Sequence, residues 1–259
     1  MDRAQYQKFA EVDKHHWWFQ ARRNIVSSLL RAKWPQPANS LEILDIGTGT
    51  GGMVPILASW GHLTATEPDR ETLALTQERF ESLGECATFK QGGWEELELS
   101  ENHFDLVTAF DVLEHCQDDR EALRKWRTWL RDDGTLLLTV PAFPSLWGLN
   151  DEISHHYRRY TRTTLLQVLA ETDFAVSKIS YINSLMFVPV WISRNIKDRI
   201  QRWFSKEKTP MPSDFDVPIA PVNLVLEKLF SWESGLLNHV DLPWGTSLLV
   251  VAQRKQPST

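Results

Sequence analysis

Short runs of apolar residues, many of them branched at Cβ, recur along the chain between turn residues. Such runs are too brief for helices and are typical of strands buried on both faces of a parallel sheet. They predict a strand that begins at Phe104, and strands over residues 41–46, 62–67, 85–91, 135–140, 174–182 and 246–254.

Apolar residues at helical spacing separate these runs. They predict an N-terminal helix in which Trp18, Ile25 and Leu29 share one face, and later helices over residues 53–60, 70–83, 119–131 and 161–172. Residues 132–134 have the composition of a turn, and residues 142–152 that of a loop. Alternating strands and helices indicate an open, mostly parallel α/β sheet that binds its ligand at the carboxyl ends of the strands.

A glycine-rich turn follows the first strand. Gly47, Gly49 and Gly51 carry no Cβ, so the backbone is free to bend there and to approach a ligand closely. The unpaired N–H groups of the following helix point to the same place. Gly47, Gly49 and Gly52 also fit the G-x-G-x-x-G spacing of NAD-binding units, so the turn alone does not identify its nucleotide.

Two sequence motifs give more information about the bound nucleotide than the turn alone. Residues 45–51 are Asp-Ile-Gly-Thr-Gly-Thr-Gly, and residues 104–115 run from Phe-Asp-Leu-Val to Val-Leu-Glu-His. The first resembles the acidic-x-Gly-x-Gly-x-Gly signature of class I S-adenosylmethionine (SAM)-dependent methyltransferases, and the second resembles their F-D-L-V-x-x-x-x-V-L-E-H motif. The resemblance implies SAM as the cofactor and a Rossmann-like sheet of seven strands, mostly parallel, with an antiparallel last strand and helices on both faces.

The resemblance also implies cofactor contacts. Asp45 and the glycine turn hold the methionine end, and Glu67, 22 positions after Asp45, accepts hydrogen bonds from the ribose hydroxyls. Gly93 stands where the family usually carries Asp or Asn, which leaves adenine to Trp94, Glu95 or backbone groups. The implied cofactor residues are Asp45, Gly47, Thr48, Gly49, Gly51, Glu67, Pro68, Gly93, Trp94, Phe110, Asp111 and His115.

The N-terminal helix opens with His-Trp-Trp-Phe-x-x-Arg-Arg, which is similar to a bacterial subgroup of small-molecule methyltransferases. In the family such a helix folds over the cofactor cleft, which makes His16, Trp17 and Arg22 candidate lid residues. The alternative is that the aromatic residues only dock the helix on the sheet.

Residues 155–161, His-His-Tyr-Arg-Arg-Tyr-Thr, follow the loop after strand 135–140 and are rich in donors and bases. We predict that His156 or His155 removes a proton from the acceptor and that Tyr157 orients it. The alternative is that the arginines pair with surface acids and the tyrosines pack. The candidate substrate residues are His16, Trp17, Arg22, Trp147, Arg158, Arg159 and Met186. No metal is expected from His15, His16, His155, His156 and Asp151, because adjacent histidines point apart in a helix or strand.

Four regions are predicted. Residues 1–40 form N-terminal lid helices, and residues 41–182 form the cofactor-binding core, which residues 246–259 complete with the last strand. Residues 183–245 are far longer than a hairpin connection needs and form a helical cap over the acceptor pocket. A homodimer interface or a membrane-surface patch is the alternative, suggested by Arg194, Lys197, Arg199, Arg202, Lys206 and Lys208.

The composition of the chain indicates which kinds of molecule it binds and where it is located. A net charge of -6 over 259 residues disfavours nucleic acid, and twelve tryptophans suggest an apolar pocket or contact with an apolar surface. Cys86 and Cys116 form no C-x-x-C pair, and neither a secretory signal nor an apolar run of membrane-spanning length is evident, which predicts a soluble cytoplasmic protein.

The predicted activity is methyl transfer from SAM to an O, N or C atom of a small apolar or amphipathic metabolite by in-line displacement. An NAD(P)-dependent oxidoreductase is one alternative, although the chain lacks the Tyr-x-x-x-Lys pair of a large class of these enzymes. A non-catalytic SAM-fold binding module is the other.

Overall fold

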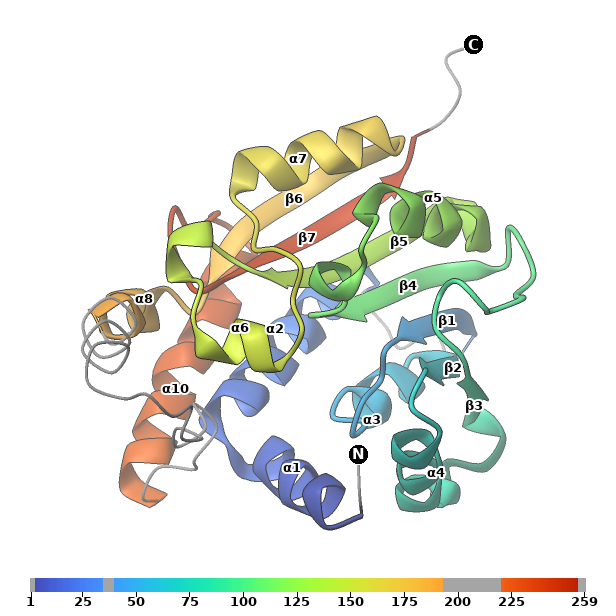
Figure 1. Cartoon of the computed structure of the whole chain (residues 1–259), viewed down its shortest axis with the longest axis horizontal. Coiled ribbons are helices and arrows are strands. Elements are labelled where there is room, and N and C mark those ends of the chain that lie inside the picture. Colours follow the sequence, from blue (N-terminus) through green and yellow to red (C-terminus); the bar gives the residue numbers. More distant parts are fainter. Residues whose placement is uncertain (1–2, 35–39, 193–219, 256–259) are drawn as a thin grey trace.

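The apolar runs form the strands of a central sheet in the computed structural model, which describes residues 3–34, 40–192 and 220–255. The strand order is β3-β2-β1-β4-β5-β7-β6 (Figure 1). The strands are β1 (Leu41–Ile46), β2 (Gly61–Glu67), β3 (Ala87–Gln91), β4 (Phe104–Phe110), β5 (Leu130–Pro141), β6 (Phe174–Ile182) and β7 (Ser247–Arg254).

The pairing directions confirm the predicted fold class. Strands β1 to β5 are parallel to their neighbours in this half of the sheet, whereas β7 lies between β5 and β6 and is antiparallel to both. Since the parallel strands point the same way, the ends of β1, β2, β4 and β5 meet at one edge of the sheet.

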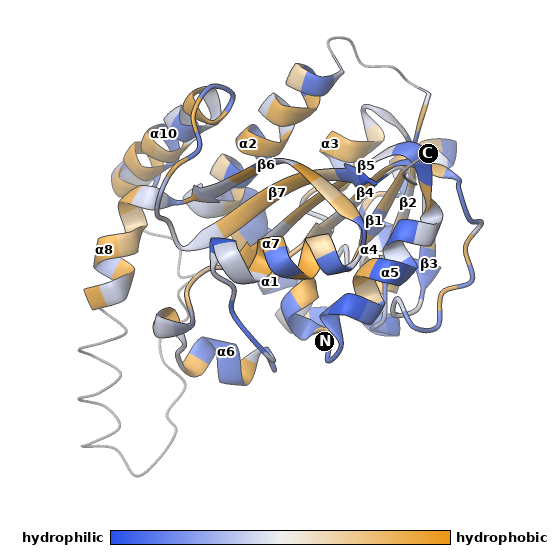
Figure 2. Cartoon of the chain, turned by 90° about the horizontal axis from the view of Figure 1, so that it is seen from above, coloured by the Kyte–Doolittle hydropathy of each residue, from blue (hydrophilic) through white to orange (hydrophobic). Residues whose placement is uncertain are grey.

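Helices cover both faces of the sheet because neighbouring strand residues point to opposite sides. Ile43 packs with α2 (Trp17–Lys33), α3 (Val54–Ala58) and Leu237 of α10 (Ala220–Leu237). Leu44 packs with α5 (Asp119–Trp129) and α7 (Arg162–Glu171) on the opposite face, and Figure 2 shows the two layers. The other elements are α1 (Arg3–His15), α4 (Arg70–Arg79), α6 (Leu149–Ile153), α8 (Ser184–Ile192), and the 3₁₀ turns η1 (Glu81–Cys86), η2 (Leu113–His115) and η3 (Pro144–Leu146).

Several element bounds differ from the predictions. The predicted helix over 53–60 is shorter in the structure, where it forms α3, and β2 begins one residue before the predicted strand, at Gly61, where a Cβ would lie 2.0 Å from the Leu41 carbonyl oxygen. The predicted helix over 70–83 ends at Arg79 and continues as η1, in which Gly84 has a φ of +53°. Strand β3 consequently begins at Ala87 rather than Glu85.

The region around β5 was also predicted differently. The turn predicted over residues 132–134 is an irregularity within β5, since Leu130 pairs with Phe104 whereas Thr135 pairs with Leu106. The stretch predicted as a loop, 142–152, contains η3 and most of α6. Helix α8 contains Pro189 in its interior.

Helices α2 and α10, which are far apart in the sequence, meet beside the sheet. The ring of Trp17 on α2 stacks on Phe230 of α10 with 4.6 Å between centroids. Asn223 of α10 accepts a 2.9 Å hydrogen bond from the Trp17 N–H and donates one of 2.8 Å to the His15 carbonyl. Helix α10 therefore completes the wall that α2 begins.

Within the described residues, no helix combines the length and the apolar character that crossing a bilayer requires. The residues of the predicted patch, Arg194, Lys197, Arg199, Arg202, Lys206 and Lys208, lie outside the described residues.

Candidate active site

The glycine turn after β1 has the backbone that its sequence predicts. Gly47, Gly49 and Gly51 have φ values of +69°, +54° and +81°, which favour glycine. A Cβ at Gly51 would lie 2.4 Å from the ring of Phe80, whereas a Cβ at Gly49 would meet nothing within 4 Å. The turn is thus packed against the protein at Gly51 and open at Gly49, which leaves room for a ligand to approach the backbone.

Two carboxyl groups flank this turn. Glu67, at the end of β2, accepts a hydrogen bond of 3.0 Å from the Gly49 N–H, and burial raises the pKa of its side chain. Asp45 is buried and accepts a hydrogen bond of 2.6 Å from the Thr108 hydroxyl. Burial raises the pKa of Asp45 to about 6, although the bond from Thr108 opposes the shift. Glu67 therefore adjoins the open part of the turn, and Asp45 lies in β1, which leads into it.

Helix α1 lies over the glycine turn. Asp13 pairs with Arg23 of α2 at 3.2 Å, and a Cβ on Gly52 would lie 2.3 Å from its carboxylate. The hydroxyl of Tyr6 lies 2.9 Å from that of Thr76, which in turn donates to the Gly49 carbonyl at 2.7 Å. These contacts hold α1 across the ligand-binding edge of the sheet.

Arg22 and Asp111 form an ion pair where β4 ends. The guanidinium of Arg22 lies 4.4 Å from the ring centroid of Trp18 and 5.8 Å from that of Phe110, so aromatic faces surround the cation. Asp111 has a φ of +55° and also accepts a hydrogen bond of 3.1 Å from the Thr139 hydroxyl. This pair links α2 to the ends of β4 and β5.

A cavity of ≈ 480 Å³ opens beside this ion pair. One wall is aromatic and comes from α2, and another is apolar and comes from α8. Polar groups from the segments after β4 and β5 line the rest. The lining includes Trp17, Trp18, Met186, Pro189, Val190, His16, Asp111, Glu114, Asp151, His156 and Arg159.

Comparisons with known proteins agree with this geometry. A family model described as a methyltransferase domain matches residues 44–138, which include the glycine turn and β4. This part of the chain is a methyltransferase domain, and it supports a class I SAM-dependent methyltransferase. This confirms the predicted family, enzyme class and cofactor, and it does not favour the oxidoreductase and binding-module alternatives.

Two curated relatives are ubiquinone biosynthesis O-methyltransferases. The one from Methylocella silvestris is 33% identical over 170 residues, which cover 60% of this chain and 66% of that protein. The one from Azorhizobium caulinodans is 30% identical over 106 residues, which cover 40% and 42%. The match therefore spans less than two thirds of either relative's length.

The fold has a solved counterpart. Phosphoethanolamine N-methyltransferase 2 from Haemonchus contortus, in complex with SAM, superposes with a TM-score of 0.56 at 18% identity. The superposition covers 90% of this chain and 52% of the other. At this sequence identity, the likeness shows that the two proteins share a fold.

Residues at the carboxyl-terminal edge of the sheet in this chain suit the binding of SAM. The open backbone at Gly49 and the carboxylate of Glu67 lie together at the end of the sheet, where an amino-acid moiety and a ribose need an amide cradle and an acceptor of hydrogen bonds. Asp45, Gly47, Thr48, Gly51, Phe110 and Asp111 belong to the same edge. Their individual contacts with SAM stay predictions.

The residues of the predicted adenine site follow the ends of β2 and β3. Pro68 is exposed at the end of β2, and Gly93 is half-buried, with a Cβ there lying 2.9 Å from the Glu95 carboxylate. Trp94 packs against the core formed with α5 and α7. Trp94 therefore has a packing role, and its contact with adenine stays a prediction.

Asp151 organises the polar side of the cavity. It is fully buried and accepts hydrogen bonds from Arg159 Nε at 2.7 Å and from the Gly148 N–H at 2.8 Å, and its Oδ1 lies 2.9 Å from Nδ1 of His156. Burial alone would raise its pKa, but these partners hold the pKa of Asp151 well below its ordinary value. His156 and Arg159 are therefore fixed in orientation by one buried carboxylate.

The other predicted residues of this region lie elsewhere. Tyr157 is 56% exposed, His155 is exposed, and neither lines the cavity. Trp147 is half-buried outside the lining. Arg158 pairs at 3.1 Å with Asp119, which is buried and so is not one of the surface acids that the alternative named. His16, Trp17, Arg159 and Met186 do line the cavity, and Arg22 pairs with Asp111, which lines it.

Glu114 is a cavity residue that the sequence analysis did not single out. Glu114 is fully buried, lines the cavity and lies beside His115 and His156. Its position within the Val-Leu-Glu-His motif was the available signal. Asp151 was considered only as a metal ligand, and its distance of five positions from His156 was the signal for their pairing.

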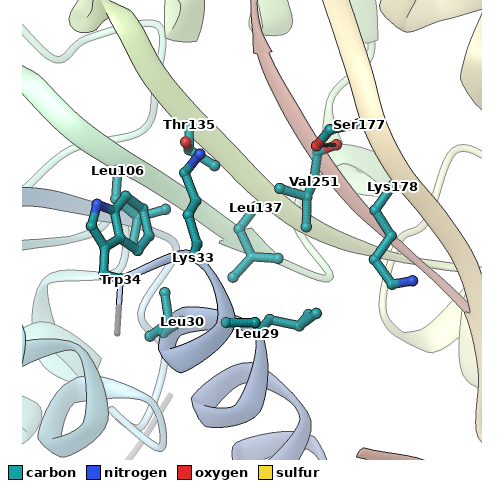
Figure 3. A pocket seen from close by; sticks show the side chains of 11 residues that line it. Leu29, Leu30, Lys33, Trp34, Leu106, Thr135, Leu137, Ser177, Lys178 and Val251 are labelled. Carbon is teal, nitrogen blue, oxygen red and sulfur yellow. Dashed lines mark hydrogen bonds between the residues drawn. The ribbon is translucent and has the colours of Figure 1, made fainter. Parts of the chain in front are cut away.

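A second hollow of ≈ 250 Å³ lies between the end of α2 and the sheet (Figure 3). Leu106 and Thr135 line it, and both precede the carboxyl-terminal parts of β4 and β5. It is therefore remote from the edge where the glycine turn and the ion pair lie.

Proposed function

We propose that this methyltransferase transfers the methyl group of SAM to an oxygen atom of a small apolar or amphipathic acceptor. The supporting observation is the ≈ 480 Å³ cavity, which joins an apolar wall to polar groups beside Asp111, at the same edge as the glycine turn. The name of the relatives, ubiquinone biosynthesis O-methyltransferase, supports oxygen over nitrogen or carbon as the acceptor.

Bound SAM supplies an activated methyl group, so the protein contributes mainly alignment. Glu67 and the N–H groups of the glycine turn hold the nucleoside and the amino-acid part, while Trp17, Trp18 and Met186 position the acceptor. Alignment of two reactants corresponds to about 7–11 kcal/mol of the activation barrier. The acceptor oxygen forms a bond to the methyl carbon as the carbon–sulfur bond breaks, and the electron pair of the broken bond stays on sulfur.

A hydroxyl acceptor must also lose its proton. Of the three residues predicted to act on it, His156 alone contributes to the described cavity lining. Its Nδ1 lies 2.9 Å from Asp151, so the other ring nitrogen is the one available to the acceptor side. We therefore place His156, rather than His155 or Tyr157, at the point where the proton leaves.

The surface next to the cavity suits an acceptor with an apolar tail. Pro189 and Val190 of α8 line the cavity, while Val188 and Ile192 of the same helix are 57% and 45% exposed. The orange colour of α8 in Figure 2 reflects this continuous apolar character. Helix α8 thus supports the cap predicted for residues 183–245, of which residues 193–219 lie outside the described chain. A cytoplasmic location, a homodimer and contact with a membrane surface stay predictions.

The function is tested by incubating the purified protein and methyl-labelled SAM with an extract of the source cell. We expect label in one organic-extractable compound that gains a single methyl group on oxygen, located by mass spectrometry and fragmentation. The Glu67→Ala variant should leave it unlabelled. Label that stays in SAM, or that appears only in precipitated macromolecules, would contradict the proposal.

A further inference from the structure

The hollow between the end of α2 and the sheet has an apolar floor and a positively charged rim. Leu106 of β4, Leu137 of β5 and Val251 of β7 form the floor, and Lys33 of α2 and Lys178 of β6 flank it (Figure 3). No acidic side chain of the described residues lines it, although the chain as a whole carries a net charge of -6. This lining suits a ligand that is apolar along most of its length and negatively charged at one end.

Thr135 brings an unpaired polar group to this hollow. It lies on β5 two residues before Leu137, so both side chains are on the same face of the sheet. Thr135 is 1% exposed, and its hydroxyl has no hydrogen-bond partner among the described residues, which costs about 1–3 kcal/mol for a buried group. The other hydroxyl of the lining, on Ser177, already donates to the Val251 carbonyl at 3.0 Å. The hydroxyl of Thr135 is therefore available to a ligand.

Lys33 is the cation that is open to an anion. It is exposed, its ammonium lies 5.2 Å from the ring centroid of Trp34, and it forms no ion pair with a carboxylate of the described residues. Figure 3 shows its side chain extending from the end of α2 toward Thr135. Lys178, in contrast, is paired with Asp241 at 2.7 Å. The charged end of a ligand therefore belongs between Lys33 and Thr135.

A bulge in β6 shapes the opposite end of the hollow. Val176 pairs with Ala252 and Lys178 pairs with Val251, so Ser177 is an extra residue in this strand. Val176 and Ala252 pack on the side of α5 and α7, whereas Val251 packs on the side of α2. The bulge thus places Lys178 on the face that carries the hollow, where its aliphatic stem adds to the apolar lining.

We propose that this hollow binds a medium-chain carboxylate, a molecule with one unbranched apolar tail and one carboxylate. The carboxylate accepts hydrogen bonds from the Thr135 hydroxyl and the Lys33 ammonium, and the tail lies over Leu137 and Val251 toward the stem of Lys178. The volume of ≈ 250 Å³ is below the range of about 300–1,000 Å³ that is typical of ligand pockets, which favours a small ligand.

This site is separate from the acceptor cavity. Trp17 and Trp18 line that cavity at the first turn of α2, whereas Lys33 is the last residue of the helix. A helix rises by 1.5 Å per residue, so about 24 Å of α2 lies between the two sites. The carboxylate is therefore a second ligand, and the inference does not depend on the identity of the methyl acceptor.

Calorimetry with octanoate and the whole protein tests the site. We expect one octanoate per chain, and an affinity that falls by about 4-fold for each methylene removed from the tail, because burying a methylene contributes about 0.8 kcal/mol. Octylammonium, which has the same tail and the opposite charge, should not bind. Thr135→Val should weaken octanoate binding by about 10- to 100-fold, because a buried hydrogen bond to a charged group is lost. Lys33→Gln, at an exposed position, should weaken it by about 2- to 5-fold.

Two neighbours of Lys33 provide the controls. Arg31→Gln removes the same charge from an exposed position of α2 that does not line the hollow, and it should leave the affinity unchanged. Ala32 is exposed and does line the hollow, so Ala32→Phe should fill it and abolish binding. Urea denaturation verifies that each variant is folded, and Thr135→Val should be no less stable than the wild type because it removes an unpaired hydroxyl.

The outcomes that overturn the proposal are distinct. Without saturable heat in the wild type, the hollow holds no carboxylate. Unchanged affinity in Thr135→Val or Ala32→Phe would place octanoate elsewhere on the protein. Equal losses in Arg31→Gln and Lys33→Gln would show attraction to positive charge without a defined site.

Discussion

The carboxylate of Glu67 accepts a hydrogen bond of 3.0 Å from the backbone N–H of Gly49, across a separation of 18 residues. This bond joins the end of β2 to the glycine turn after β1. The second carboxylate oxygen accepts from the Asp69 N–H at 3.2 Å. Glu67 is therefore already oriented at the edge where the ribose is predicted to bind.

Replacing Glu67 by glutamine tests its predicted contact with the ribose. The amide keeps the size of the side chain but loses the charge, and hydrogen bonds to charged groups contribute about 1.5–3 kcal/mol. We expect the affinity for SAM, measured by calorimetry, to fall by about 10- to 100-fold. Glu71→Gln, at an exposed position on α4, is the matched control. Equal affinities for both variants would remove Glu67 from the cofactor site.

Alanine at Gly49 and at Gly51 should separate binding from stability. At Gly51, the Cβ would lie 2.4 Å from Phe80 and φ is +81°, so we expect the free energy of unfolding to fall by about 2–5 kcal/mol. At Gly49 the Cβ meets open space, and the strain of the left-handed backbone costs only about 1–2 kcal/mol.

For the affinity for SAM, the larger effect is expected at Gly49 instead of Gly51. The added methyl group of Gly49→Ala occupies the space where SAM approaches the backbone, so calorimetry should show a marked loss of affinity. Urea denaturation gives the stability of each variant. A Gly49→Ala protein that binds SAM as well as the wild type would show that the ligand does not lie on this side of the turn.

The buried carboxyl of Asp45 should make stability depend on pH. Burial raises its pKa from 3.8 to about 6 in the folded protein, so between these values the folded state holds a proton that the unfolded chain releases. Its contribution to the free energy of unfolding therefore decreases as pH rises through this range, by about 3 kcal/mol in total.

Asp45→Asn removes this titration while keeping an acceptor for the Thr108 hydroxyl. Relative to the wild type, the variant should gain about 3 kcal/mol of stability between about pH 4 and about pH 7. Urea denaturation of both proteins across this range measures the difference. A constant difference would mean that Asp45 titrates at its ordinary pH.

The two cysteines should react differently with iodoacetamide. Burial, and then the nearby carboxylates of Glu95 and Glu114, raises the pKa of the Cys116 thiol to about 12, which leaves roughly 10⁻⁴ of it as the reactive thiolate at pH 8. Cys86 is exposed. Mass spectrometry should find one adduct on the native protein, absent from Cys86→Ser, and two after unfolding. Rapid labelling of Cys116 in the native protein would contradict its burial.

The sequence predicts the sheet well because buried parallel strands are almost uniformly apolar. In β4, for example, Leu106, Val107 and Ala109 are all fully buried, and the pattern needs no tertiary information. The glycine turn is equally local, since the left-handed backbone selects its residues. These features also carried the family assignment.

Contacts between residues far apart in the sequence escaped prediction. Helix α1 falls within the lid helices predicted for residues 1–40, but the contacts that anchor it, such as Asp13 with Arg23 and Tyr6 with Thr76, were not predicted. The pair of Arg22 with Asp111 joins residues 89 positions apart, so no local spacing announces it. Likewise, the burial of Glu114 depends on the segment around His156 folding back over η2.

The placement of β7 has a consequence for how the chain matures on the ribosome. Because β7 is inserted between β5 and β6, one side of β5 stays unpaired until residues 247–254 have been synthesised, and β6 has no strand to join before then. The nucleotide-binding half is able to assemble early around β1, β2 and β4. The half that receives the acceptor has to wait, with an open strand edge exposed to aggregation until the closing strand arrives.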